Sequence, residues 1–296
     1  MSTLRLLGST VLSAAASHNL ADVASARTEL GIVAPNAVTD AWLTQAIAQV
    51  SRAIEKHTRR VFVPEVVQET FEPAARDYNR PQGTNALQLG RWPVASVVSV
   101  TLTLGGAAQT LVEGTDFLVD AANGTLTRLD PTTGHGTNWI ADRVAVTYLA
   151  GYGASVTEAA TVPTSPYQVT VSQSAEFSCD IGVTYAGSPL VRVAANPAAG
   201  QYAVSAGVYT FAAADAGHAL TVTYGTADVP ADLQEICLRL VTARYKSRDR
   251  DPALVQRETP GVGVERWWVG QVPGQTGPFA PEIEYALDQY VAPVVA

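Results

Sequence analysis

Residues 229–248, VPADLQEICLRLVTARYKSR, decide the fold class of this 296-residue chain because they hold its clearest amphipathic helix. The apolar side chains recur at the i, i+3, i+4, i+7 and i+8 positions that line one face of a helix: Leu233, Ile236, Cys237, Leu240 and Val241. Pro230 suits a first helical turn, and Asp232 places an acid near the positive end of the helix dipole. We expect one helix that continues to about Arg248.

Before this helix, residues 162–228 change to a pattern with a period of two. Short alternating runs such as YQVTVS, GVTYA and HALTVTY follow one another, and turn residues separate them. This spacing is typical of a small antiparallel sandwich or barrel. We expect an inserted all-β domain whose two ends, near Val162 and Val229, lie close together.

Earlier in the chain, helices come first and strands follow. Residues 20–30 predict a short helix, and a second helix should begin after Thr39 and end near Arg60. Its apolar face would hold Leu43, Ile47, Val50 and Ile54. The chain as a whole is therefore expected to be α+β.

The strands that follow are predicted at residues 97–104, 116–129 and 143–149. Val98, Val100, Leu102 and Leu104 would share one face of the first strand. Asn123-Gly124 tolerates the positive φ angles of a tight hairpin turn, so residues 116–129 should form a hairpin.

After the helix of residues 229–248 the chain becomes basic, then rich in glycine and proline, and finally acidic. Arg244, Lys246 and Arg248 are either solvated charges or contacts to an acidic surface of a neighbouring subunit. Trp267-Trp268 lies in the Gly/Pro-rich stretch, where the two indoles either fold back on their own domain or anchor it on a partner. A short acidic helix is expected over residues 281–290.

Composition limits the classes of function. Hydrophobic residues make up 47% of the chain and charged residues 16%, which is enough apolar surface for a core. The formal charge of −8 argues against a protein that grips nucleic acid through its phosphates. No run reaches the ~18 apolar residues of a membrane span. Residues 1–17 loosely resemble a secretion signal, but Gly8, Ser9 and Thr10 interrupt the apolar run, so we do not expect cleavage.

Residues that carry chemistry form no known constellation. Cys179 and Cys237 are too few for a disulfide framework and are expected to be free thiols, with Cys237 buried. The four histidines are scattered, and neither a metal-binding spacing nor a nucleophile elbow occurs. We therefore expect no enzyme, no metal and no cofactor.

Six phrases, in order, resemble the head–tail adaptor, or connector, family of tailed bacteriophages and phage-like particles. They are LADVASARTELGI (20–32), IEKHTRRVF (54–62), WPVASVVSV (92–100), DFLVDAANGTL (116–126), YLAGYG (148–153) and VPADLQEICLRLVTARYKSR (229–248). The chain departs from the family pattern by interposing residues 162–228 between the last two phrases.

The resemblance implies a helical adaptor core with β-hairpins. Residues 1–161 would be its first part and 229–256 its final helix, with the inserted domain at 162–228 and an extended C-terminal arm and tail at 257–296. It further implies a structural protein of the virion neck, assembled in the host cytoplasm. Copies would form a ring, commonly a dodecamer, that binds the portal protein, continues the DNA channel and docks the next neck, stopper or tail protein. Genomic DNA would pass through the lumen without sequence-specific binding, and no membrane is involved.

The expected partner-binding residues, toward the portal or a neighbouring subunit, are Trp267, Trp268, Phe279, Tyr290, Arg244, Lys246 and Arg248. An alternative is a surface- or carbohydrate-binding accessory virion module. It would use an aromatic face formed by five tyrosines of the insert, at positions 167, 185, 202, 209 and 224; the same residues also suit core or edge positions of the strands.

Overall fold

The computed structural model describes residues 4–73, 85–248, 256–259, 263–266 and 279–292. The chain divides into two compact units. Met1–Ser17 and Val61–Asp228 form one, here called the β unit, and His18–Arg60 and Val229–Ala296 form the other, the helical unit. Both helices and antiparallel sheets are present, which confirms the expected α+β class. The expected grouping of helices and hairpins in one core differs from this division.

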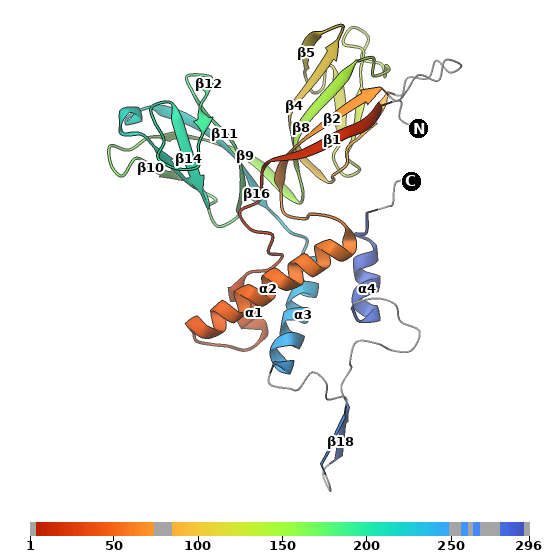
Figure 1. The fold of residues 1–296 in the computed structure, drawn as a ribbon, viewed down its shortest axis with the longest axis vertical. Helices are drawn as coiled ribbons and strands as arrows, with labels where there is room; N and C mark the ends of the chain where they lie inside the picture. The colour runs from red at the N-terminus through yellow and green to blue at the C-terminus, as the bar shows by residue number, and fades with distance from the viewer. Residues whose placement is uncertain (1–3, 74–84, 249–255, 260–262, 267–278, 293–296) are drawn as a thin grey trace, which may run out of the picture. The chain divides into compact units, whose positions relative to one another are not determined.

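The helical unit contains four described helices (Figure 1). They are α1 (Val23–Glu29), α2 (Ala37–Thr58), α3 (Ala231–Ser247) and α4 (Pro281–Asp288), and a hairpin of β17 (Gln256–Thr259) and β18 (Gly263–Arg266) belongs to the same unit. Strands β17 and β18 lie within the segment that was expected to be a simple extended arm.

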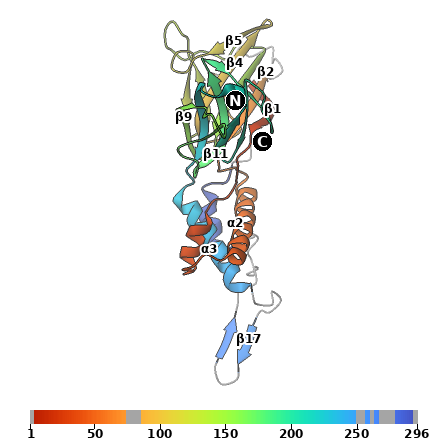
Figure 2. The same ribbon diagram turned by 90° about the vertical axis from the view of Figure 1, so that its left-hand side faces the viewer.

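Helix α2 begins three residues earlier than expected, because the side chain of Asn36 caps it. The Asn36 Oδ1 atom accepts hydrogen bonds from the backbone N–H of Val38 (2.9 Å) and of Thr39 (3.3 Å). Helix α2 packs against α3, and the two lie side by side in both views (Figures 1 and 2). Their predicted apolar faces are buried, except that Leu240 is only half-buried.

The first part of the β unit is a five-stranded antiparallel sheet in the order β1-β2-β8-β4-β5. Its strands are β1 (Leu4–Ser13), β2 (Glu65–Pro73), β4 (Val94–Leu104), β5 (Ala107–Leu111) and β8 (Arg143–Ala150). A three-stranded sheet, β3-β7-β6, comprises β3 (Ala86–Gln88), β6 (Phe117–Asp120) and β7 (Thr125–Arg128). Side chains from both sheets, among them Val67, Leu126 and Tyr148, form one hydrophobic core.

Two details of the predicted strands are wrong. In β4, Val100 and Leu102 are buried but Val98 is exposed, because a register shift between Val97 and Ser99 leaves it opposite no residue of β8. Leu104 is also exposed, at the end of the strand beside the turn to β5. The β6–β7 hairpin is closed by the pair Asp120 and Thr125, so its loop has four residues. Within that loop only Gly124 has a positive φ, of 64°, and the expected tight Asn-Gly turn does not form.

The second part of the β unit contains two four-stranded sheets, in the orders β12-β11-β16-β9 and β10-β15-β14-β13. Their strands are β9 (Gly153–Thr161), β10 (Gln168–Thr170), β11 (Phe177–Tyr185), β12 (Ser188–Pro189), β13 (Val191–Arg192), β14 (Gln201–Ser205), β15 (Val208–Phe211) and β16 (Ala219–Ala227), with a short 3-10 turn, η1 (Ala213–Asp215). The predicted alternating runs match these strands closely.

The boundary of this second part differs from the expectation. Strand β9 pairs with β16 along its whole length, from Gly153 opposite Ala227 to Thr161 opposite Ala219. These residues therefore share a sheet with the segment after residue 162 and lie ahead of the expected boundary. The expected end at Val162 is wrong, because its N–H donates to the carbonyl of His218 at 3.0 Å, at the opposite end of β16 from Asp228. The chain enters and leaves this part at Tyr152 and Asp228, where the N–H of Asp228 donates to the carbonyl of Tyr152 at 2.9 Å.

Candidate partner-binding surfaces

Four of the six phrases that carry the family resemblance meet at one junction in the β unit. The N–H of Tyr152 donates to the carbonyl of Phe62 at 2.7 Å, and the N–H of Gly151 donates to the carbonyl of Pro93 at 2.9 Å. The N–H of Val94 in turn donates to the carbonyl of Ala121, in the hairpin phrase, at 2.8 Å. The phrases thus hold one another through backbone hydrogen bonds.

Close approach at this junction explains two residues of the YLAGYG phrase. A Cβ atom on Gly151 would lie 2.8 Å from the backbone of Pro64, and Gly151 has a φ of 132°. A Cβ on Gly153 would overlap the carbonyl oxygen of Thr226 on the paired strand. The ring of Tyr152 stacks on the buried ring of Phe62, with centroids 6.1 Å apart. The phrases therefore support the architecture of the chain and bring no reactive groups together.

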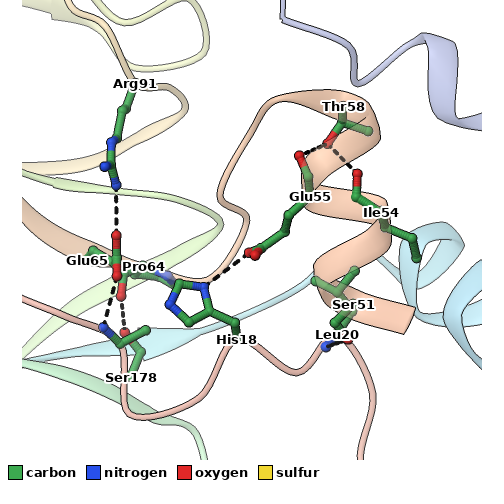
Figure 3. Close-up of polar contacts among 11 residues, drawn as sticks. His18, Leu20, Ser51, Ile54, Glu55, Thr58, Pro64, Glu65, Arg91 and Ser178 are labelled. Atoms are coloured by element: carbon green, nitrogen blue, oxygen red, sulfur yellow. Dashed lines mark hydrogen bonds and ion pairs between the residues drawn. The ribbon is translucent and has the colours of Figure 1, made fainter. Parts of the chain in front are cut away.

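Buried carboxylates in the first sheet also have structural partners. Glu65 is bound by the guanidinium of Arg91 at 2.7 Å, as Figure 3 shows. Glu69 accepts a hydrogen bond from the N–H of Gly90 at 2.9 Å. Burial raises the pKa of Glu69, while its bonds to Gly90 and Tyr148 act in the opposite direction. Both glutamates on β2 thereby hold the loop after β3 against the sheet.

The second part of the β unit contains one further buried carboxylate. Asp180 on β11 accepts hydrogen bonds from the hydroxyls of Tyr202 (2.8 Å) and Tyr209 (2.9 Å), and the guanidinium of Arg192 lies at 3.6 Å. Burial raises the pKa of Asp180, and the two hydroxyls and Arg192 oppose that rise. This network links β11 in one sheet to β13, β14 and β15 in the other.

The tyrosines of the insert do not form the aromatic face that the alternative function needs. Tyr202, Tyr209 and Tyr224 are buried in the core of this second part. Tyr167 packs against the same core, and Tyr185 stacks on His218 with centroids 4.1 Å apart. The prediction of a five-tyrosine binding face is wrong, because four of the five tyrosines lie in or against this core and Tyr185 alone among them is exposed.

Three of the four histidines likewise have local partners: His18, His57 and His218. Nδ1 of His18 lies 3.1 Å from a carboxylate oxygen of Glu55 on α2 (Figure 3). His57 packs edge-to-face on Phe279 with centroids 5.4 Å apart. Over the described part of the chain, no group of three or more histidine, cysteine or acidic side chains is arranged to hold a metal ion.

Strand β1 is an open edge of the five-stranded sheet, with β2 as its neighbour. Leu6, Leu7, Val11 and Leu12 are exposed along it, Leu7 by 51% and Leu12 by 52%. Register shifts next to these two leucines leave them opposite no residue of β2. Arg5, the strand's only charged residue, is bound to Glu72. Proteins usually protect such edges with charge, proline or a covering element.

Three of the predicted partner-binding residues lie together at the end of α3. Arg244, Lys246 and Arg248 are exposed in the last turns of that helix. Phe279 is buried against His57, and the hydroxyl of Tyr290 donates to Asp232 at 2.6 Å, so both anchor α4 within their own unit. Trp267 and Trp268 lie outside the described residues.

The arginines at the end of α3 border a pocket on the surface of the helical unit. Its volume is about 350 Å³, and it is lined by Trp42, Gln45, Ala46, Gln49, Arg244 and Arg248. The Arg244 guanidinium donates to Oε1 of Gln49 at 3.0 Å, which fixes its direction. The ring of Trp42 packs edge-to-face on Tyr245, and the guanidinium of Arg248 lies 4.1 Å from the centroid of that tyrosine. We refer to this site as the Trp42 pocket.

The sequence prediction found the arginines of this pocket but missed Trp42. That residue lies next to Leu43, off the predicted apolar face of α2, and its position beside the apolar stripe is the only signal that marks it. Trp42 lines the pocket only because α3 lies beside α2, and no local sequence pattern predicts that packing.

Among the described helices, none has the length and hydropathy needed to cross a bilayer. No family model matches the chain, and no curated protein matches it. Two solved structures contain similar chains. One is described as "Neck of empty GTA particle computed with C6 symmetry", with 14% identity, 99% of this chain and 97% of that chain covered, and a TM-score of 0.40. The other is "Virion of native gene transfer agent (GTA) particle", with 13% identity, the same two coverages and a TM-score of 0.37.

Proposed function

We propose that this chain is a structural virion protein of a phage-like neck. It acts as a head–tail adaptor whose copies form a ring, commonly of twelve, on the portal protein. The ring continues the DNA channel and docks the next neck, stopper or tail protein. The six phrases in family order support the adaptor role, and the junction described above gives four of them a common structural purpose.

The observation that carries the proposal is the open edge strand β1. It forms one edge of the sheet within the described residues, with exposed leucines at its two register shifts. The opposite edge of the described sheet is β5, and Leu104 and Val112 are exposed at its ends. A subunit with two different open edges is suited to head-to-tail contacts between copies, the kind of contact that closes into rings.

The charge of the chain fits a DNA conduit. With a formal charge of −8, the protein offers little attraction to phosphate, so DNA can slide through the lumen without being held. The adaptor catalyses no reaction. It is assembled in the host cytoplasm and is located in the virion neck.

The portal contact is assigned to the arm and tail, residues 257–296, with Trp267 and Trp268 as anchors. Phe279 and Tyr290 hold α4 in place in this scheme and do not insert into the portal. Truncation after Asp251 should abolish binding to portal rings while leaving the β unit folded. Undiminished binding by the truncated chain would contradict this assignment.

The second part of the β unit is proposed to decorate the ring, either as bulk or as a docking site for a fibre, collar or capsid protein. Because β9 pairs with β16, a deletion that tests this must remove residues 153–227 as one block. Ring formation on the portal should persist after that deletion, and its loss would show that the insert takes part in the ring.

The adaptor role is tested by measuring the mass of portal rings with and without the purified chain. We expect a discrete complex that carries a closed set of copies, even if the chain alone is monomeric. A Leu7→Lys/Leu12→Lys variant, which alters only exposed side chains of β1, should form no such closed set of copies. Absence of any complex between the unmodified chain and its portal at micromolar concentration would refute the role.

A further inference from the structure

The Trp42 pocket has the composition of a protein-binding site. A tryptophan and two arginines border a cavity of about 350 Å³, and tryptophan and arginine are the residues most enriched where interfaces gain their affinity. Gln45, Ala46 and Gln49 complete the lining, and within it the Arg244 guanidinium donates to the neutral Oε1 atom of Gln49 at 3.0 Å. The pocket therefore suits a segment that carries negative charge and an aromatic ring.

Helix α4 presents such a segment. Glu282, Tyr285 and Asp288 are spaced three residues apart, which places them on one face of the helix, and all three are exposed. Tyr285 is 84% exposed, the largest exposure of any aromatic side chain among the described residues. The opposite face of α4 is occupied, because Leu287 is buried.

Within one copy, α4 lies far from the pocket. The hydroxyl of Tyr290 binds Asp232 at 2.6 Å, and the N–H of Ala292 donates to the carbonyl of Thr58 at 2.9 Å. These contacts hold α4 at the first turn of α3 and the last turn of α2. Asp232 and Arg244 are twelve residues apart on α3, or about 18 Å at the helical rise of about 1.5 Å per residue. A helix of eight residues in that position does not reach the pocket of its own copy.

We propose that the exposed face of α4, formed by Glu282, Tyr285 and Asp288, docks in the Trp42 pocket of a second copy of this chain. Tyr285 inserts beside Trp42, and the two acids lie on the Arg244 side of the pocket. The donor face and the acceptor pocket lie at opposite ends of the helical unit, so each copy uses one toward each neighbour. Such contacts are heterologous and propagate in one direction, as a ring requires. This inference rests on the proposed ring and adds a contact between helical units to the one proposed at strand β1.

Cross-linking between two single-cysteine variants tests the contact. One preparation of the full chain carries Gln45→Cys and the other, with a different affinity tag, carries Tyr285→Cys. The native Cys179 and Cys237 are buried, so they contribute little background. The two are mixed on portal rings and treated with a short bis-maleimide. We expect a cross-linked product that contains both tags. Ala53→Cys, at an exposed position of α2 outside the pocket lining, replaces Gln45→Cys as the control and should give none.

Charge exchange then tests the chemistry. Arg244→Glu in the pocket-bearing chain should lower the mixed product at least about tenfold, because it places like charges face to face. Glu282→Arg in the chain bearing Tyr285→Cys should restore the product to within about threefold of the starting yield.

Any of four results would overturn the inference. Equal cross-linking of the Gln45→Cys and Ala53→Cys chains would show that the pocket has no specific occupant of this kind. An intrachain link in a dilute monomeric Gln45→Cys/Tyr285→Cys double variant would show that the chain fills its own pocket. Cross-links from Gln45→Cys to portal protein would make the portal the occupant. Rings on the portal without the mixed product would refute the contact and leave the adaptor role intact, whereas absence of portal-bound chain would refute the adaptor role itself.

Discussion

The Asp180 network makes a prediction whose size follows from the structure. Tyr209→Phe removes a hydroxyl that donates to the buried Asp180 carboxylate at 2.9 Å, while the ring keeps its packing on Phe177 and Tyr202. The lost bond is charge-assisted and buried, so the free energy of unfolding of the β unit should fall by about 2 kcal/mol at pH 7. Tyr185→Phe is the matched control, because its ring stacks on His218 at the surface and should change stability by less than about 0.5 kcal/mol.

The pH dependence separates this mechanism from loss of packing. Burial raises the pKa of Asp180 above its ordinary value of 3.8, so the contribution of this group to stability falls as the pH rises from 3.8 through the folded-state pKa. The hydroxyl of Tyr209 limits that fall, and its removal should therefore cost most where the carboxylate is ionised. Below the folded-state pKa, the loss should shrink to about 1 kcal/mol, the value of a neutral hydrogen bond.

The assay is urea unfolding, monitored by hydrogen exchange of peptides from β11, β14 and β15. It is run at pH 7 and at the lowest pH at which the chain stays folded. A loss that is the same at both pH values, or equal to that of Tyr185→Phe, would refute the assignment of the tyrosine hydroxyl to an ionised Asp180.

Three further predictions concern other parts of the chain. Gly153→Ala should destabilise the β unit by about 3 kcal/mol or more in thermal unfolding, because the new methyl group overlaps the carbonyl of Thr226, whereas Gly8→Ala, with open space around it, should shift the midpoint little. Leu7→Lys/Leu12→Lys should leave the unfolding midpoint within about 2 °C of the unmodified chain but abolish the ring on the portal in mass measurements, and retention of the ring would show that β1 is not an interface. Burial raises the pKa of Cys237 to about 11, so at pH 8 its thiol should alkylate only after unfolding, and rapid labelling of the native chain in intact-mass spectra would contradict its placement.

Local periodicity predicted most elements of this fold. The helices α2 and α3 and nearly every strand of the insert were visible as apolar spacing, because each buries one face and alternates or repeats accordingly. The pairing register of the strands was harder to predict from the sequence. The shift between Val97 and Ser99 exposes Val98 and cannot be seen in an uninterrupted apolar run.

Non-local pairing accounts for the remaining differences. Strand β9 was grouped with the residues before it because nothing in its own sequence states that its partner is β16, more than fifty residues later. The Trp42 pocket also depends on contacts between residues that are far apart in the sequence. The basic end of α3 was predicted from Arg244, Lys246 and Arg248, but the pocket exists only because Trp42 on α2 lies beside them.

The prediction that Phe279 and Tyr290 are anchors for a partner differs from their place in the structure for a related reason. An aromatic residue in an irregular segment suggests an exposed anchor, yet Phe279 is buried by His57, a residue more than two hundred positions away in the sequence. Open edges such as β1 are equally invisible to local patterns. The run LRLLGSTVLS indicated only a leader-like segment, and the structure places it as strand β1 at the edge of the described sheet.

The most direct test of the account is symmetry-averaged electron cryomicroscopy of portal rings incubated with this chain. The account predicts a closed ring of identical copies whose lumen continues the portal channel, with density between adjacent subunits at α4 and the Trp42 pocket. Portal rings without added density, or single copies bound at scattered sites, would contradict it.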